Sequence, residues 1–564
     1  MQRSELRATR TEVTSEIGVV SAGHMAEAEA GARVLAGGGN AVDALVAAAF
    51  AGFVVEPQMC GLAGYGRLAL SVPGQGFFTI DHSARVPAGA RADMYEIDDE
   101  SPPTYYGWPR TKGRRNEWGH LSVPVPGAVA GLCLAHERWG RLRLAEVLEP
   151  AIGLADAGIL TTWELILAIA ERRSELDQLP HAAALLLDHG AIPSAYAPRR
   201  IDLSDLARVL REIAARGAAG FYDGWVAEAI AREMREGGGI LTAADLAAYE
   251  PRVVREQPGR FAGCDYITAY DQVGYEALNI LERFDVGALA PESAEFRHLM
   301  AEALGHAYVD SMLHYGDPDF TESPVNGLAS PAFAAERARG ISLERAAPRP
   351  IAPGDPWPFE TGARAPAEPP AGPSAGGTRG TSQMAAVDRD GLMCSLCTTV
   401  GNTFGSVVLV PGTGMFLTNA MQNYDPRPDR ANRIQPGRMP IFGVPEIVAT
   451  RAGEAVFAAA GSGGYRITTG VLTTMVGVLA QGLGLQAAID VPRVHNQGDE
   501  TFVDSRIALG VRERLSSLGH RIVVQDEAPG VTAFGRVSAV ARDPATGVLR
   551  AGSGPAWSTA AAGA

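Results

Sequence analysis

A segment rich in proline, glycine and alanine, from Arg345 to Arg379, most constrains how this chain of 564 residues folds. It holds few large apolar side chains, so it is typical of an extended, poorly packed linker. The sequence before it is mainly helical in pattern from about Ala128 to Leu313, and the sequence after it is a series of short β-rich runs between glycine turns. We therefore predict that this segment separates two parts of the chain in a layered α+β architecture.

Several elements can be placed from cap and turn residues. Ala26 to Ala36 predicts a helix that stops at three glycines, and Asn40 can cap a second helix from Ala41. Apolar runs on both sides of a Pro-Gly turn predict a hairpin. The remaining expected elements are strands at Arg67–Val72, Phe77–Ile80, Met384–Asp388, Leu392–Val400, Ser406–Val410, Ile447–Ala449 and Ala455–Ala459, and a helix around Thr468–Leu485.

Charge and composition exclude several functions. A formal net charge of -15 argues against a nucleic-acid partner, because phosphate binding requires clustered Lys and Arg. The most apolar segment, Ala41 to Val55, is interrupted by Asp43 and is shorter than the roughly 18 to 20 residues of a membrane span. The first residues lack the apolar core of a secretory signal, so we expect a cytoplasmic protein. The motifs of phosphate loops and zinc hydrolases are missing, so we predict no cofactor and no metal.

The cysteines are interpreted as core residues. Five is an odd and sparse number, which fits reduced thiols. Cys394 and Cys397 are three residues apart on an expected strand, so their side chains point to opposite faces and cannot share a ligand.

The linker ends in Gly380-Thr381 directly before an expected strand. Glycine has no Cβ to shield its carbonyl, so the Thr381 hydroxyl stands beside an unhindered peptide bond, a geometry that favours self-cleavage. Cleavage would give Thr381 a free α-amine with an ordinary pKa of about 7.7 to 8.0, which suits a general base. One residue would then supply both nucleophile and base. From spacing alone, a plain linker entering a strand is the commoner interpretation.

The run from Thr381 to Gly391 resembles the start of the small subunit of the γ-glutamyltransferase family. Further landmarks of that family occur in the same order along most of the chain. They are Gly37 to Ala44, Val54 to Pro57, Val125 to Gly131, Leu241-Thr242 with Asp245 to Tyr249, Gly316 to Phe320, Asn402 to Gly405, Gly412 to Gly414, Gly463 to Thr469 and Pro492 to Gln497.

The resemblance implies a four-layer αββα sandwich of the N-terminal nucleophile hydrolase type. It also implies cleavage between Gly380 and Thr381 into a large subunit, residues 1–380, and a small subunit, residues 381–564, that stay together as a heterodimer. Thr399 matches a second threonine that orients the nucleophile, and the backbone N–H groups of Gly463 and Gly464 match an oxyanion hole. Adjacent glycines suit that role because the donors must approach the oxyanion without obstruction.

The sequence departs from the family where a γ-glutamyl group would be held. An expected arginine falls on Ser83, although Arg85 follows, and an expected asparagine falls on Gly401, beside Asn402. The positions expected to hold the α-amine and the carboxylate fall on Ala420, Asn423, Ile441 and Phe442. His82, beside Ser83, is kept as a pocket candidate. Buried charges need partners, so an apolar wall of Ile441 and Phe442 favours an apolar or flat acyl group.

Three functions stay open. The first is a self-processing hydrolase that forms a Thr381 acyl-enzyme and cleaves an amide or activated C–C bond of a small metabolite in secondary metabolism. The family resemblance includes such branches: cephalosporin and other acylases, oxamate amidohydrolases, and C–C bond hydrolases of pyrrolobenzodiazepine and lincosamide pathways. The second is a true γ-glutamyl hydrolase or transferase that uses Arg85, Asn402 and Asn423. The third is an unprocessed scaffold protein.

Overall fold

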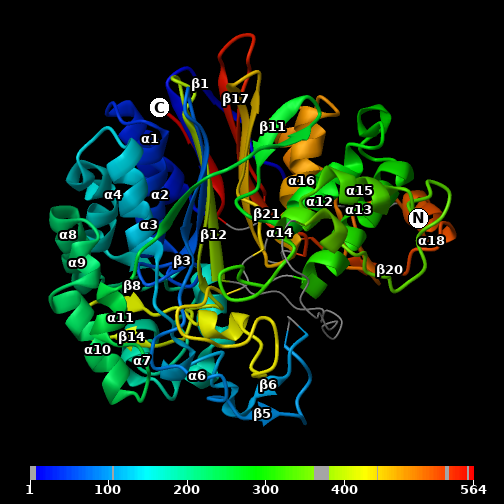
Figure 1. The fold of residues 1–564 in the computed structure, drawn as a ribbon. Helices are drawn as coiled ribbons and strands as arrows, with labels where there is room; N and C mark the ends of the chain where they lie inside the picture. The colour runs from blue at the N-terminus through cyan, green and yellow to red at the C-terminus, as the bar shows by residue number, and fades with distance from the viewer. Residues whose placement is uncertain are drawn as a thin grey trace.

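The computed structural model of the chain describes residues 8–104, 107–314, 316–360, 380–440, 443–527, 533–555 and 558–564 (Figure 1). Two seven-stranded sheets stand face to face in the middle of the molecule, and every strand pairing within them is antiparallel. In order across the first sheet, the strands are β23 (Ala560–Gly563), β2 (Gly18–Ala22), β12 (Gly380–Asp388), β13 (Met393–Gly401), β3 (Tyr65–Val72), β4 (Gly76–His82) and β9 (Arg252–Arg255). Across the second they are β1 (Val13–Ser15), β22 (Leu549–Ser553), β21 (Arg536–Arg542), β17 (Glu454–Ser462), β16 (Ile447–Arg451), β11 (Cys264–Ile267) and β10 (Gly259–Phe261).

Each sheet is built from both predicted parts of the chain. β12 and β13, which follow the linker, lie in the centre of the first sheet between β2 and β3, which come from the first 72 residues. Their position in the middle of a sheet explains why β12 is buried along its whole length. Neither part could therefore close its own sheet alone.

The side chains of β12 alternate between two environments, as the pleat of a strand requires. Ala385 and Val387 pack with Val448 and Val540 of the second sheet. Met384 and Ala386 face the other way and join the core under the helices. Thr381 belongs to the first set by this alternation, so its hydroxyl lies on the face between the two sheets.

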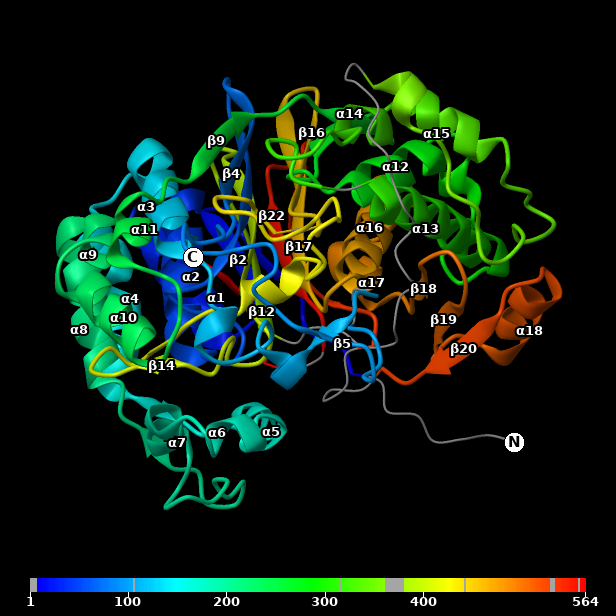
Figure 2. The ribbon, with the colours of Figure 1, turned by 60° about the horizontal axis from the view of Figure 1, so that its bottom comes forward.

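Helices cover the outer face of each sheet (Figures 1 and 2). On the side of the first sheet lie α1 (Met25–Ala36), α2 (Ala41–Val55), α3 (Ala128–Trp139), α4 (Leu144–Ala157), α8 (Ser204–Arg216), α9 (Ala219–Tyr222), α10 (Trp225–Glu236) and α11 (Ala243–Ala247). On the side of the second lie α12 (Gln272–Leu281), α13 (Ala294–His314), α14 (Val325–Leu328), α15 (Pro331–Ala338), α16 (Arg466–Leu479) and α17 (Leu485–Asp490). The short helices α5 (Trp163–Glu171), α6 (Arg173–Leu176) and α7 (Pro180–Leu186) project from one end, and α18 (Leu509–Ser517) packs beside the small sheet of β18 (Val494–Asn496), β19 (Thr501–Asp504) and β20 (Ile522–Gln525) (Figure 2).

The predicted cap at Asn40 is confirmed. Its side chain accepts hydrogen bonds from the N–H groups of Val42 and Asp43, and Asp43 bonds back to the Asn40 N–H, which completes a capping box. Nearly all of α2 is buried against β12 and β13. The small alanine side chains allow this close packing, so the helix fixes the back of the strand that begins at Gly380.

Two expectations about local structure are wrong. The helix around Thr468–Leu485 is two helices, because the chain turns at Gly482, whose φ of +70° favours glycine. The described part of the linker is also well packed: Ile351 and Trp357 are buried, and the N–H groups of Ala346 and Ile351 donate to the carbonyls of Leu518 and Gly498. Residues 361–379 lie outside the described residues.

The predicted α+β class is confirmed. Cys394 and Cys397 are buried on opposite faces of β13, one in the core under the helices and the other toward the second sheet. Within the described parts of the chain, every helix is too short or too polar to cross a membrane.

Candidate active site

The pairing of β12 with β13 brings Thr381 and Thr399 together. They are direct cross-strand partners, and a bulge follows, because the next pair is Gly380 with Gly401 and one residue of β13 is left unopposed. Both threonine side chains are buried, with Thr381 at 6% exposure. The bulge turns the chain at the junction of the two predicted parts, so the Gly380–Thr381 peptide bond stands at the end of the strand.

The hydroxyls of the two threonines form a directed chain of hydrogen bonds. The Thr381 Oγ1 hydroxyl donates to Thr399 Oγ1 at 3.1 Å, and the Thr399 hydroxyl donates to the Gly380 carbonyl oxygen. The Gly401 N–H also donates to Thr399 Oγ1, at 2.8 Å. Each hydroxyl has one proton, so Thr399 accepts from the Thr381 hydroxyl and donates to the carbonyl of the residue before Thr381.

Gly380 and Gly401 both occupy positions that exclude a side chain. A Cβ at Gly380 would collide with the carbonyl oxygens of Gly401 and Asn402. Gly401 has a φ of +94°, and a Cβ there would collide with Asn419 Oδ1. The glycines therefore let the two strands close around the threonine pair.

Gly463 and Gly464 form a turn between β17 and α16. Their φ angles are +130° and +61°, conformations that glycine adopts readily, and they lie directly before the N-terminus of α16. Arg536 links this turn to Thr381: its Nε donates to Ser462 Oγ at 2.8 Å, and its Nη2 donates to the Thr381 carbonyl oxygen at 3.1 Å. The arginine thus joins Thr381 on β12 to the residue that precedes the glycine pair.

Tyr65 is the direct partner of Thr399 in the pairing of β3 with β13. Its side chain therefore lies on the same face of the sheet as Thr399, on the strand opposite to that of Thr381. The Tyr65 hydroxyl accepts a hydrogen bond from Asn423 Nδ2 at 2.7 Å. Two positions along β3, Arg67 is buried and pairs with Asp81 at 3.7 Å. Sequence reasoning missed Tyr65, Arg67 and Arg536. The expected strand began at Arg67, whereas β3 begins at Tyr65, so the alternation of Tyr65 and Arg67 on one face appears only in the structure.

The residues around Ser83 separate into two environments. His82 pairs with Gly66 on the face of the sheet that meets α3, and it packs against Gly131 of that helix. Burial lowers the pKa of His82 to about 4, so the imidazole is neutral. Ser83 is buried, and its N–H donates to Asp81 Oδ1, whereas the Arg85 guanidinium lies 3.8 Å from Asp81 Oδ2. We carry Arg85 forward as a pocket candidate and leave out His82, which faces away from Thr381.

The remaining pocket candidates lie after β13. Asn402 follows Gly401, and its Nδ2 donates to Gln422 Oε1 at 2.8 Å. Ala420 and Asn423 belong to the 3-10 helix η5 (Ala420–Asn423), and both are buried. The structure therefore gathers Gly401, Asn402 and Asn423 around the ends of β13 and β3. Ile441 and Phe442 lie outside the described residues.

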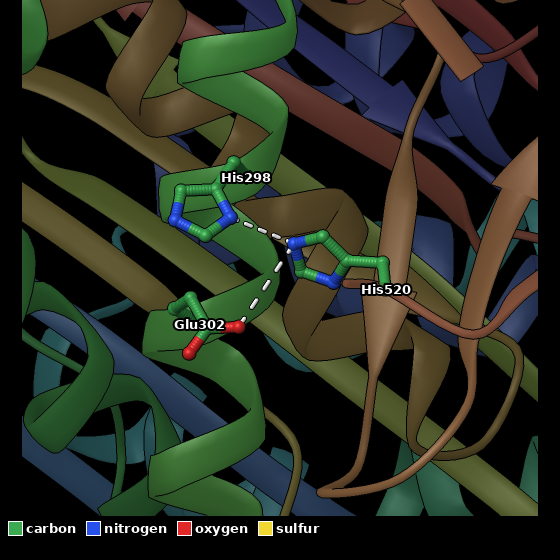
Figure 3. Close-up of side chains that lie close together, drawn as sticks. All are labelled: His298, Glu302 and His520. Carbon is green, nitrogen blue, oxygen red and sulfur yellow. Dashed lines mark hydrogen bonds and ion pairs between the residues drawn. The ribbon is translucent and has the colours of Figure 1, made fainter. Parts of the chain in front are cut away.

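His298, Glu302 and His520 form a second buried cluster (Figure 3). Among the described residues, His298, Glu302 and His520 bring ligand-type atoms within 4.8 Å of one another. His298 Nε2 donates to the Ser342 carbonyl, so its Nδ1 accepts from His520 Nε2 at 2.7 Å.

The other atoms of this cluster are also engaged. His520 Nδ1 accepts from Thr501 Oγ1 at 2.9 Å, and the carboxylate of Glu302 pairs with the guanidinium of Arg349. A cation next to that guanidinium would be repelled, so the residues present do not fit a metal ion. The cluster instead joins Ser342 and Arg349, at the start of the linker, to His520 and Thr501 beyond it.

This cluster predicts loss of stability in acid. Burial, with the charges of His298 and Arg349, lowers the pKa of His520 to about 3. The unfolded state, with an ordinary histidine pKa of about 6.5, therefore binds the proton more readily, and the stabilisation that is present above that pH declines as the pH falls toward 3. At pH 5, protonation of His520 in the unfolded state lowers the free energy of unfolding by about 2 kcal/mol. We expect His520→Asn to lower the melting temperature at pH 7.5 but to reduce its further drop at pH 5. An equal drop in both proteins would contradict this assignment.

Comparisons with known proteins identify the family of the chain. The sequence matches the family model described as gamma-glutamyltranspeptidase over residues 27–564. It is 35% identical over 538 residues to the acylase ACY 1 proenzyme of a Pseudomonas species, covering 94% of this chain and 91% of that protein. It is 30% identical to the glutathione hydrolase proenzyme of Bacillus subtilis, covering 89% and 85% of the two chains.

The fold has solved counterparts. The crystal structure of cephalosporin acylase from Bacillus halodurans is similar with a TM-score of 0.84 at 27% identity, over 100% of this chain and 99% of that one. The likeness therefore extends over both predicted parts and includes the strand that starts at Gly380. The chain belongs to the gamma-glutamyltranspeptidase family of N-terminal nucleophile hydrolases.

Proposed function

We propose that the chain is a proenzyme that cleaves itself before Thr381 and then uses Thr381 as an N-terminal nucleophile to hydrolyse an amide or activated C–C bond of a small metabolite. One observation carries this proposal: the Thr381 hydroxyl donates to Thr399, and the Thr399 hydroxyl donates to the Gly380 carbonyl. The nucleophile, the polarising donor and the bond to be cleaved are thus already assembled in the uncut chain.

Self-cleavage would proceed by an acyl shift. Thr381 Oγ1 attacks the Gly380 carbonyl carbon, its proton passes to Thr399, and the Thr399 proton moves to the developing oxyanion. The C–N bond then breaks, the nitrogen takes a proton, and Gly380 is held as an ester on Thr381. Water hydrolyses this ester, which leaves a carboxylate on Gly380 and a free α-amine on Thr381.

Turnover would use the same groups. The α-amine takes the proton of the Thr381 hydroxyl as it attacks the substrate carbonyl, and the N–H groups of Gly463 and Gly464 stabilise the oxyanion. The leaving group departs as an amine, or as a carbanion when a neighbouring carbonyl stabilises it. Water then releases the acyl group from Thr381.

The quaternary organisation is part of the proposal. We take the order of helices, two sheets and helices to be the four-layer αββα sandwich of this superfamily. The names of the relatives from Pseudomonas and Bacillus include the word proenzyme, which supports processing here. Residues 1–380 and 381–564 would then form a heterodimer, held together because each sheet takes strands from both.

The structure favours a substrate other than a γ-glutamyl compound. Two of the groups that could replace the usual recognition residues already form hydrogen bonds within the protein, Asn402 with Gln422 and Asn423 with Tyr65, and a substrate would have to displace these contacts. The third, Arg85, lies beside Asp81, which offsets its charge, although its Nη1 has no hydrogen-bond partner among the described residues. The name acylase of the Pseudomonas relative agrees with a different acyl group, and we place the reaction in secondary metabolism.

Four p-nitroanilides that differ only in the acyl chain test this point. γ-Glutamyl carries an ammonium and a carboxylate, glutaryl lacks the ammonium, 4-aminobutyryl lacks the carboxylate, and butyryl lacks both. We expect the γ-glutamyl compound to be the poorest, with turnover below about 1 per second, the low end of typical enzymes. Release of p-nitroaniline is measured on protein whose processing has been verified by mass.

Two results would change the assignment. If γ-glutamyl-p-nitroanilide is hydrolysed fastest of the four, the chain is a γ-glutamyl hydrolase or transferase. If the chain stays whole and hydrolyses none of them, the scaffold function replaces both.

A further inference from the structure

A buried charge network lies directly behind the candidate nucleophile. Ser382, the next residue after Thr381, points to the opposite face of the sheet, where its hydroxyl contacts Glu56 Oε2 at 2.9 Å and Glu27 Oε1 at 3.2 Å. Both glutamates are buried, at 0% exposure for Glu27 and 4% for Glu56. Glu27 also closes the capping box of α1, since the His24 N–H donates to its Oε2.

Both carboxyl groups contact the Ser382 hydroxyl. Burial, with the adjacent charge and hydrogen bond of Glu56, raises the pKa of Glu27 well above its usual range. This favours the protonated form of Glu27. The cation that interacts with the two glutamates is Arg536, which is buried and whose largest charge interactions are with Glu56 and Glu27.

Arg536 uses its donors on the strand of the nucleophile. Its Nη2 donates to the Thr381 carbonyl and its Nε to Ser462 Oγ, so one planar guanidinium fixes the two residues that flank the reaction centre. Thr381 loses its covalent tether on the N-terminal side when the chain is cut. The Arg536 hydrogen bond then remains to hold the backbone of the new terminus.

We propose that Arg536, neutralised by the Glu27–Glu56 pair, is a positioning residue that aims the hydroxyl and the α-amine of Thr381 at the substrate carbonyl. This inference rests on the proposed function of Thr381. The groups that face Arg536 are Glu27 from α1, Glu56 after α2, Glu164 from α5 and the thiol of Cys60. The positive charge of Arg536 also disfavours the ammonium form of the Thr381 α-amine, so it favours the neutral amine that acts as the base at neutral pH.

The test uses p-nitrophenyl acetate, an activated ester that needs no specificity pocket. Thr381 Oγ attacks the ester carbonyl, p-nitrophenolate leaves, and the acetyl group stays on Thr381 until water removes it, so the burst reports acylation. Arg536→Lys keeps the charge but loses the planar guanidinium with its paired donors, so we expect acylation to be about tenfold slower. The acidic limb of the pH profile, where the rate falls because the Thr381 α-amine is protonated, should change little.

A charge-balanced variant separates positioning from stability. Arg536→Met alone leaves a buried negative charge without a partner, so it is combined with Glu56→Gln. We expect the double variant to fold, to acylate about 10²-fold more slowly, and to have its acidic limb moved to higher pH because the nearby cation is gone. Arg337→Met combined with Asp310→Asn is the matched control, since it removes the buried pair of Arg337 with Asp310, without a contact to Thr381 among the described residues.

The outcomes distinguish the two levels of the proposal. If the wild type gives a burst, and both Arg536 variants give the same burst rate and the same acidic limb as the wild type, the positioning role is overturned but the proposed function is not. Slower acylation in the Arg337 control, equal to that in the double variant, also overturns it, because general destabilisation would then explain the effect. A wild-type chain that stays whole and gives no burst overturns the proposed function and this inference together.

Discussion

Thr381→Ala is expected to leave the chain whole and to abolish turnover. The substitution removes the hydroxyl that would attack Gly380, and without cleavage there is no free α-amine to act as base. The rate should fall by several orders of magnitude, as it does when a nucleophile is removed from a set of groups that act together. Processing is followed by intact mass, and turnover by release of p-nitroaniline from the best of the four anilides.

The conservative variant provides the control for this result. Thr381→Ser keeps the hydroxyl and loses only a methyl group, so it should still cleave itself and show measurable turnover. Cleavage of Thr381→Ala at the same bond, at the wild-type rate, would mean that another group performs the processing step.

Thr399→Val should slow self-cleavage about 10²- to 10³-fold, the usual cost of removing a donor from a developing oxyanion. Valine has nearly the same shape as threonine, but it can neither accept from Thr381 Oγ1 nor donate to the Gly380 carbonyl. It also leaves the Gly401 N–H without its acceptor, at a cost of about 1 to 3 kcal/mol in stability. The measurement is the fraction of cut chain over time after synthesis, determined by mass.

The neighbouring threonine is a matched control. Thr398 is buried on the opposite face of β13, and its hydroxyl has no hydrogen-bond partner among the described residues. Thr398→Val should therefore cleave itself at the wild-type rate. Equal slowing in the two variants would assign the effect to the strand and not to the Thr399 hydroxyl.

Local structure could be predicted from the sequence where one short segment decides it. The cap at Asn40 was predictable because Asn40 and Asp43 satisfy each other's backbone groups within four residues. The opposite faces of Cys394 and Cys397 follow from strand geometry alone. The break at Gly482 was missed, although Gly484 follows two residues later, because single glycines are also tolerated inside a helix.

The candidate site was harder, because its geometry depends on contacts between distant segments. Gly380-Thr381 was a weak signal by itself and became specific only through the family resemblance. Arg536 could not be found from the sequence, since its contact with Thr381 spans 155 positions and requires the two sheets to face each other. His82 was placed beside Ser83 by the sequence, but alternation along β4 turns its side chain to α3.

The intact mass of the freshly purified wild-type protein tests the central claim most directly. The account predicts two fragments that remain together under native conditions, residues 1–380 and 381–564, whose masses sum to the whole chain plus one water. Sequencing of the smaller fragment should begin at Thr381. A single chain of 564 residues that persists on long incubation, or a cut at any other bond, would contradict the account.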